Sequence, residues 1–176
     1  SILLKIGSLY IDQKEYDRAL DYLNMAYDVR PNNILVNYYI GAVFEAQGKY
    51  DKALEVLKRA LNSEPKSFEI RLLMGKVYEK MGFKEKTFTL LEEGAKEDPE
   101  NPDTYYYLGL LKSQSIEYSE ATIYFKKAIN INPKNEAYHF SLGAAYERLK
   151  QYDETIEEMK KVLEINPNHS NAHNFV

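Results

Sequence analysis

Histidines are the side chains best suited to chemistry in this sequence, and there are three, at positions 139, 169 and 173. His169 and His173 are four residues apart, a spacing at which two imidazoles on one helical turn can share a metal ion. No third ligand joins them, and no glutamate completes an HExxH pattern. The absence of cysteine excludes disulfides, thiolate catalysis and zinc–thiolate sites. We therefore expect no metal ion and no cofactor, and we expect both histidines to lie in a solvated turn.

Two other patterns resemble catalytic motifs only superficially. The segment from Gly41 to Lys49 has the glycines and lysine of a phosphate loop, but six residues separate Gly41 from Gly48 and a tyrosine follows the lysine. This spacing cannot form the phosphate cradle. Carboxylate pairs such as Glu157 and Glu158 are adjacent in sequence and would point about 100° apart on a helix, so they do not converge on one substrate atom. The sequence predicts no catalytic residue and hence no enzyme.

Composition narrows the possible partners. The 176 residues carry 23 basic and 27 acidic side chains, a formal net charge of −4. A nucleic-acid-binding protein would need a basic face, which this balance argues against. No run of eighteen apolar residues occurs, so the sequence predicts no membrane span.

The glycines and prolines recur with a period of 34 residues, which indicates a repeat architecture. Within each period, apolar residues are spaced three and four apart, as in amphipathic helices. The glycine brings a helix close to its neighbour, the proline ends the unit, and the Gly48-Lys49 and Gly82-Phe83 steps are typical of turns between two helices. The periodic residues are Gly7, Gly41, Gly75, Gly109 and Gly143, with Pro31, Pro65, Pro99, Pro133 and Pro167.

These positions together resemble the tetratricopeptide repeat (TPR) family. The best copy runs from Asn33 to Lys66 and carries Gly41, Phe44, Tyr50, Ala53, Leu57, Ala60 and Pro65. Two positions depart from the family pattern. Lys112 replaces an aromatic residue, and we expect its ammonium to reach solvent beside an otherwise aromatic row. Gly94 replaces alanine in a helix, so we expect the third and fourth repeats to be the weakest.

The resemblance implies an all-α, right-handed superhelical solenoid of antiparallel helix pairs, forming a single domain over 1–176 without a linker. The expected repeats are 1–33, 34–67, 68–101, 102–135 and 136–169, with a partial sixth repeat at 170–176. The expected first (A) helices are 1–13, 35–47, 69–81, 103–115 and 137–149. The expected second (B) helices are 16–30, 50–63, 84–97, 118–131 and 152–165.

Both ends of the sequence fall inside a repeat, and we interpret the chain as a fragment of a longer protein. The flank of the last helix pair is then expected to be apolar and able to self-associate.

In the family, residues of the A helices that face the concave groove hold the ligand. Equivalent residues, 34 apart, form columns along this groove, and two columns are rich in tyrosine and leucine, which suit a reversible interface. Structural packing explains the first column, at Tyr38, Tyr106 and Phe140, equally well. The expected groove residues are Tyr38, Tyr39, Leu72, Leu73, Lys76, Lys80, Tyr106, Tyr107, Leu110, Phe140 and Arg148.

Two binding modes known in the family do not fit these columns. The lysine and asparagine residues of the clamp that captures a chaperone's C-terminal carboxylate are absent, and so is a ladder of asparagines. Recognition through side chains remains, and the expected partner is an apolar or amphipathic protein or peptide segment.

The leading hypothesis is thus a non-catalytic protein–protein interaction scaffold. A structural or self-associating spacer is one alternative, and the substrate-recognition arm of an enzyme outside this sequence is another. A helical-repeat RNA reader is opposed by the net charge and by the lack of a repeated basic code.

Overall fold

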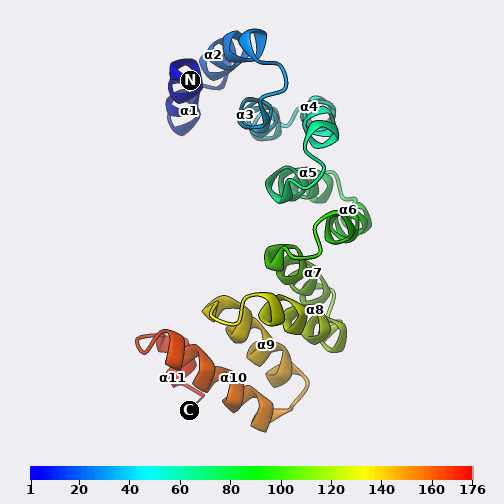
Figure 1. The fold of residues 1–176 in the computed structure, drawn as a ribbon, viewed down its shortest axis with the longest axis vertical. Coiled ribbons are helices and arrows are strands. Elements are labelled where there is room, and N and C mark those ends of the chain that lie inside the picture. The colour runs from blue at the N-terminus through cyan, green and yellow to red at the C-terminus, as the bar shows by residue number, and fades with distance from the viewer. Residues whose placement is uncertain (176) are drawn as a thin grey trace. The chain divides into compact units, whose positions relative to one another are not determined.

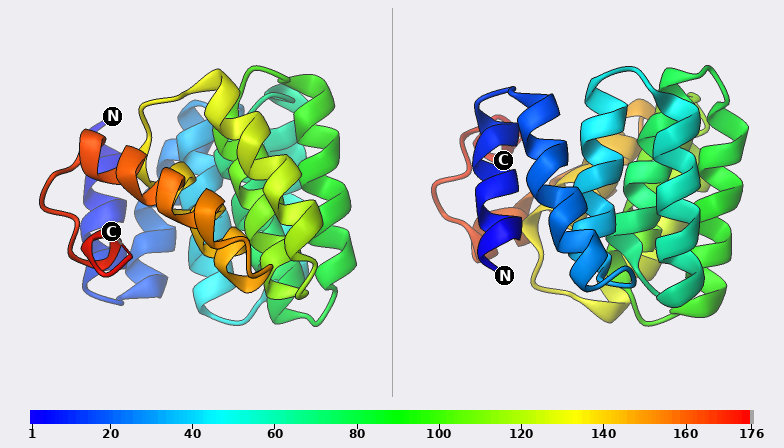
Figure 2. Two further views of the ribbon diagram at one scale, coloured as in Figure 1. Left: turned by 90° about the horizontal axis from the view of Figure 1, so that it is seen from below. Right: turned by 90° about the horizontal axis from the view of Figure 1, so that it is seen from above.

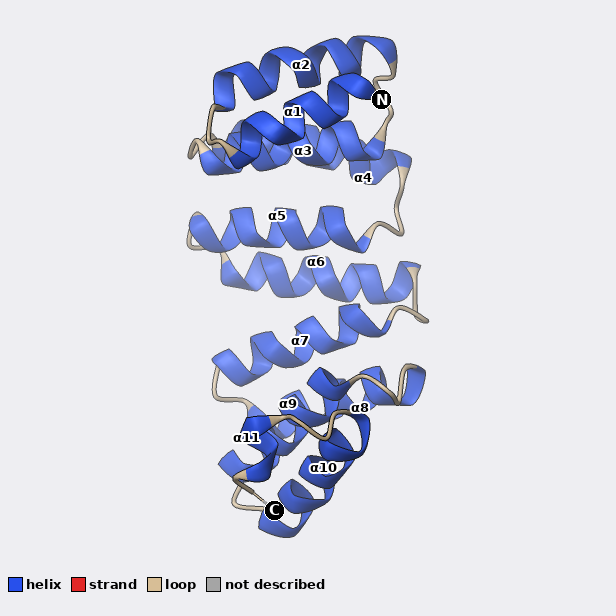
Figure 3. Ribbon diagram, turned by 90° about the vertical axis from the view of Figure 1, so that its left-hand side faces the viewer, coloured by secondary structure: helices blue, strands red, loops and turns tan. Residues whose placement is uncertain are grey.

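The computed structural model describes residues 1–175, and within that range it contains helices and loops but no strand (Figure 3). The helices, labelled in Figure 1, are α1 (Ile2–Asp12), α2 (Tyr16–Val29), α3 (Ile34–Ala46), α4 (Tyr50–Ser63), α5 (Phe68–Lys80), α6 (Lys84–Glu97), α7 (Pro102–Gln114), α8 (Tyr118–Ile131), α9 (Glu136–Arg148), α10 (Tyr152–Ile165) and α11 (Ser170–His173).

The predicted helices are confirmed, with bounds that differ by a residue or two. Odd-numbered helices from α1 to α9 are the A helices and even-numbered helices are the B helices of a 34-residue repeat. The prediction of an all-α helical-repeat fold is correct. No helix in the described part of the chain is both long and apolar enough to cross a membrane.

The chain divides into two compact units, Ser1–Leu90 and Leu91–Val176. The first contains α1 to α5 and the second contains α7 to α11, while the division falls within α6. In the first unit, α1 and α2 lie side by side and run in opposite directions (Figure 2). The prediction of a single continuous domain over 1–176 stays a prediction.

Each A helix begins at a polar residue that caps its free backbone N–H groups. The Asn33 side chain accepts a hydrogen bond from Val36 N at 3.0 Å, and Asn135 accepts from Ala137 N at 3.0 Å. Such caps satisfy donors that have no partner within the helix. Equivalent caps are Ser1, Ser67, Asn101 and His169.

The turn from A helix to B helix requires a left-handed residue. Gly48 and Gly82 adopt φ of 72° and 84°, which glycine tolerates without steric cost. The sequence-based assignment of these two glycines to turns is confirmed. Lys14, Ile116 and Lys150 occupy the same turn position with positive φ, and a branched residue such as Ile116 is strained there.

The periodic glycines let the two helices of a repeat approach closely, as predicted. A Cβ added at Gly41 would lie 2.6 Å from Leu57 Cδ2, and one added at Gly109 would lie 2.6 Å from Phe125 Cε1. Both partners are buried core residues on the B helix. The helix-propensity cost of glycine, about 0.5–1 kcal/mol, is therefore offset by close packing.

Lys112 keeps its ammonium at the surface, as the sequence suggested, and holds it between two carboxylates. Its side chain is only 18% exposed, and its ammonium lies 2.8 Å from Glu117 and 2.6 Å from Glu120. Hydrogen bonds to Glu117 and Glu120 raise the pKa of Lys112. The aromatic row on the A helices does not reveal these partners, because Glu117 and Glu120 lie at the start of the following B helix, α8.

Candidate functional site

The A helices place pairs of tyrosines side by side. In the first unit, the Tyr38 and Tyr39 rings meet edge to face with centroids 5.6 Å apart, and in the second unit Tyr106 and Tyr107 repeat this arrangement at 5.7 Å. All four side chains are half-buried, so each leaves part of its ring accessible. The tyrosines thus provide apolar area with polar tips on two A helices.

The first tyrosine of each pair also packs between helices. Tyr38 contacts the core cluster around Leu57 and Met74, and the Tyr106 ring lies 4.9 Å from the Tyr138 ring. Phe140 likewise packs against the cluster around Met159, and its ring is tilted by 36° to the His169 ring with centroids 4.9 Å apart. Packing therefore explains the tyrosine and phenylalanine types at this position.

The two leucines predicted on α5 differ in exposure. Leu72 is half-buried, whereas Leu73 is 7% exposed and belongs to the core of the first unit. Leu73 offers almost no surface to a partner, so its prediction as a groove residue is corrected. The column pattern could not separate the two, because a one-residue step on a helix turns the side chain by about 100°.

Lys76 and Lys80, both predicted groove residues, share an acidic partner. Lys76 Nζ lies 3.0 Å from one oxygen of Glu45 and Lys80 Nζ lies 3.9 Å from the other. The Glu45 side chain is only 8% exposed, while the two lysines are about half exposed. Glu45 therefore joins α3 to α5 and compensates part of the positive charge of this face.

In the second unit, a cavity of about 330 Å³ opens where α7, α8 and α9 meet. Leu110 and Arg148, both predicted groove residues, belong to its wall. No ion pair from a described residue reaches Arg148, which is exposed. The cavity is lined by Leu110, Ser113, Gln114, Tyr118, Phe125, Ser141, Ala144, Ala145 and Arg148.

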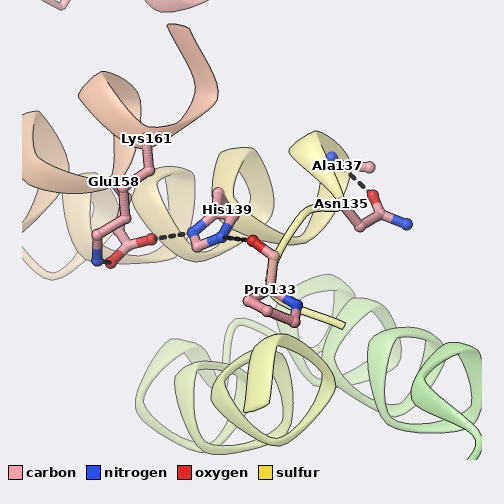
Figure 4. Close-up of polar contacts among 6 residues, drawn as sticks. All are labelled: Pro133, Asn135, Ala137, His139, Glu158 and Lys161. Carbon is pink, nitrogen blue, oxygen red and sulfur yellow. Dashed lines mark hydrogen bonds and ion pairs between the residues drawn. The ribbon is translucent and has the colours of Figure 1, made fainter. Parts of the chain in front are cut away.

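A buried polar cluster lies on the other side of α9, where the close-up in Figure 4 shows His139 between Glu158 and Pro133. Nδ1 of His139 lies 2.6 Å from Glu158 Oε2, and Nε2 lies 2.9 Å from the Pro133 carbonyl oxygen. The ring of His139 thus lies between two oxygen atoms, one from the Glu158 carboxyl group and one from the backbone. The remaining Glu158 oxygen lies 2.7 Å from Lys161, and this hydrogen bond raises the pKa of Lys161.

The cluster borders a cavity of about 760 Å³ between the ends of α8 and α10. The buried groups of the cluster, His139 and Glu158, already have partners within the protein. We therefore interpret it as a structural link between α9, α10 and the preceding turn.

His169 and His173 serve the local backbone. His169 Nδ1 accepts a hydrogen bond from Ala172 N at 3.1 Å, and His173 Nε2 lies 2.8 Å from the Pro167 carbonyl oxygen. Among residues 1–175, no group of three or more possible metal ligands comes together. The four-residue spacing of His169 and His173 thus arises from their two positions in the repeat: His169 caps a helix, and His173 contacts the preceding turn.

The ends of the array are only partly covered. Met159 and Val162 of α10 pack against Ala172 of α11 and are fully buried, whereas Ile156 and Ile165 of the same helix are exposed. At the first helix, Ile2 is 78% exposed and Leu9 is also exposed. Val176, the last residue of the expected partial repeat, lies outside the described residues. Self-association through the ends stays a prediction.

Family models for the repeat match most of the sequence. They are described as TPR repeat over residues 44–82 and as tetratricopeptide repeat over residues 1–33, 102–135 and 136–169. The chain belongs to the TPR family. No curated protein matches the sequence.

Solved TPR proteins share the fold over nearly the whole chain. MamA is 25% identical with a TM-score of 0.72, covering 94% of this chain and 97% of MamA. YrrB, described as a TPR protein with an unusual peptide-binding site, is 17% identical with a TM-score of 0.66, covering 98% and 89%. TTC0263, a TPR protein of Thermus thermophilus, is 18% identical with a TM-score of 0.67, covering 98% and 94%. This TPR fold supports a role in protein interaction.

One set of TPR positions was missed by the sequence analysis. The fourth residue of α3, α5, α9 and α11 reaches back six residues to the proline carbonyl of the preceding turn, as Asn37 does to Pro31 at 2.8 Å. Arg71 makes the same contact with Pro65, and so do His139 and His173 with their own prolines. Asparagine, arginine and histidine share only the ability to donate a hydrogen bond. The residue type therefore does not repeat from one unit to the next, and it does not reveal this column of positions. The fixed offset from the periodic proline could have revealed the column.

Proposed function

We propose that this TPR protein is a non-catalytic interaction scaffold whose A helices bind a segment of a partner protein. The observation that carries the proposal is the exposed part of the paired tyrosines, at Tyr39 on α3 and Tyr107 on α7, within a TPR fold. Large aromatic side chains with few rotatable bonds give contact area at low entropic cost.

Charged side chains on two other A helices, α5 and α9, support an amphipathic segment. Lys76 and Lys80 are half exposed although Glu45 holds them, and Arg148 projects beside an apolar cavity. A segment with apolar anchors and acidic groups would complement either feature. The absence of the asparagine ladder and of the clamp residues favours recognition by side chains over capture of a terminal carboxylate.

The test replaces Tyr39 and Tyr107 by alanine together. Short random peptides displayed on phage are selected against the whole chain, and the affinity of the best binder is measured by fluorescence anisotropy. We expect the double variant to bind about fivefold or more weakly, since interface tyrosines commonly contribute 1 kcal/mol or more.

Tyr152→Ala is the matched control, because Tyr152 is an exposed tyrosine at the start of a B helix. It should bind the peptide like the unmodified chain, and circular dichroism should show the same helix content for all variants. Equal affinity of the double variant and the unmodified chain would show that the A-helix tyrosines are not the binding surface.

A further inference from the structure

The internal repeat allows the cavity of the second unit to be compared with the same place in the first unit. Residues 68 apart occupy equivalent repeat positions. Glu45 corresponds to Ser113, Lys76 to Ala144 and Lys80 to Arg148. The ion-paired cluster of the first unit thus has its counterpart at the cavity wall of the second.

In the first unit, the position equivalent to the cavity is occupied by the charged side chains of Glu45, Lys76 and Lys80. Glu45 is nearly buried and pairs with a lysine at 3.0 Å and another at 3.9 Å. In the second unit the acid is replaced by serine and one cation by alanine, and both replacements are smaller. The remaining cation, Arg148, keeps its charge but has no carboxylate at the position equivalent to Glu45.

The floor of the second-unit cavity is apolar. Phe125 is almost fully buried beneath it, and Leu110 and Ala144 are half-buried. Its volume, about 330 Å³, is at the lower end of the range for ligand pockets. It therefore suits one or two side chains of a bound segment better than a whole cofactor.

We propose that this cavity takes an acidic side chain of the partner segment, which supplies to Arg148 the carboxylate that Glu45 supplies to Lys80. An apolar neighbour in the same segment packs on Leu110 and Phe125. An arginine that meets a carboxylate away from bulk water forms a charge-assisted hydrogen bond, which adds specificity as well as affinity. This inference rests on the proposed scaffold function and specifies the partner as an acidic, apolar-flanked segment.

The experiment uses the same displayed random peptides against the whole chain and two cavity variants. The unmodified chain should enrich peptides with aspartate or glutamate beside an aliphatic or aromatic residue. Arg148→Glu should reverse the preference, enriching lysine or arginine instead. Ser113→Glu should restore the acid of the first unit, pair with Arg148 from within and weaken the selected peptide about tenfold or more.

Ser119→Glu is the matched control, since it makes the same charge change at an exposed serine of α8 outside the cavity wall. It should leave both the enrichment and the affinity unchanged. Thermal melting checks the folding of each variant. Ser113→Glu should melt no lower than the unmodified chain, so that its loss of binding reflects occupation of the site.

The outcomes separate this inference from the proposed function. Two results would overturn the acidic site and leave the scaffold function intact. In the first, the enriched peptides carry no acidic residue. In the second, the peptides bind Ser113→Glu and Arg148→Glu unchanged yet lose affinity for the variant with Tyr39→Ala and Tyr107→Ala. A library that yields no binder to the unmodified chain would overturn both.

Discussion

At the scale of single residues, the fourth repeat exchanges one kind of charge contact for another. In the first three repeats, a cation of the B helix lies over the aromatic ring of the A helix, as Arg18 does over Tyr10 at 5.8 Å and Lys86 over Tyr78 at 5.5 Å. In the fourth repeat, Lys112 takes the aromatic position and Glu120 takes the position of the cation. The polarity of the contact is reversed, and the attraction between the helices is kept.

This reversal predicts a coupled effect on stability. Lys112→Tyr alone places Glu120 near a ring face, and Glu120→Lys alone places two ammonium groups together, so each single variant should melt at a lower temperature. The double variant recreates the cation–ring pair of the first three repeats and should melt higher than either single variant. Circular dichroism melts of the four proteins check this, and additive single effects would contradict it.

The contribution of the Lys112–Glu120 ion pair to stability should depend on pH. The hydrogen bond from Lys112 lowers the pKa of Glu120 below its ordinary 4.5, so the contribution is complete above that value and is lost as the pH falls through the lower folded-state value. The stability difference between the unmodified chain and Lys112→Tyr should therefore shrink in acid.

At the scale of helices, the periodic glycines set the distance between the A helix and the B helix of each repeat. The B-helix side chain that faces the glycine differs from repeat to repeat. Gly109 faces the rigid ring of Phe125, whereas Gly143 faces the terminal methyl of Met159, with the Cβ position 2.7 Å from Cε. A flexible methionine can move aside, while a ring held by the core cannot.

Gly109→Ala should therefore destabilise the protein by about 1–3 kcal/mol through overpacking. Gly143→Ala is the comparison and should change stability by less than about 1 kcal/mol, because the gain in helix propensity offsets the movement of Met159. Urea titrations of both variants measure the difference. Equal losses would show that the partner side chain does not decide the cost.

At the scale of the whole molecule, α6 is the helix within which the division into two units falls. It carries a buried glycine, Gly94, where the other B helices carry small buried residues such as Ala60 and Ala128. Alanine occupies this repeat position in other B helices, and the glycine lowers the helix propensity of α6.

Gly94→Ala should therefore stabilise the chain by up to about 1 kcal/mol. Gly82→Ala is the opposite control, because φ at Gly82 is 84° and alanine is strained there. Thermal melts should rise for the first variant and fall for the second. A lower melting temperature for Gly94→Ala would mean that the added methyl group meets a close neighbour.

How far the sequence alone predicts this protein depends on the range of the interactions. The period of 34, the helix bounds and the turn glycines follow from local rules, since caps, turns and amphipathic spacing involve residues a few positions apart. The tyrosine columns and Arg148 followed from the same period combined with the family resemblance. Whether they bind a partner is a proposal.

Only the tertiary structure decided which of these side chains are available. Leu73 is buried, Lys76 and Lys80 are held by Glu45, and Arg148 lies beside an open cavity. Each of these facts depends on contacts between residues on different helices, about fifteen to thirty-five positions apart in the sequence. A repeat pattern gives the helix and the position, but the identity of the facing residue and its distance are properties of the packed helices.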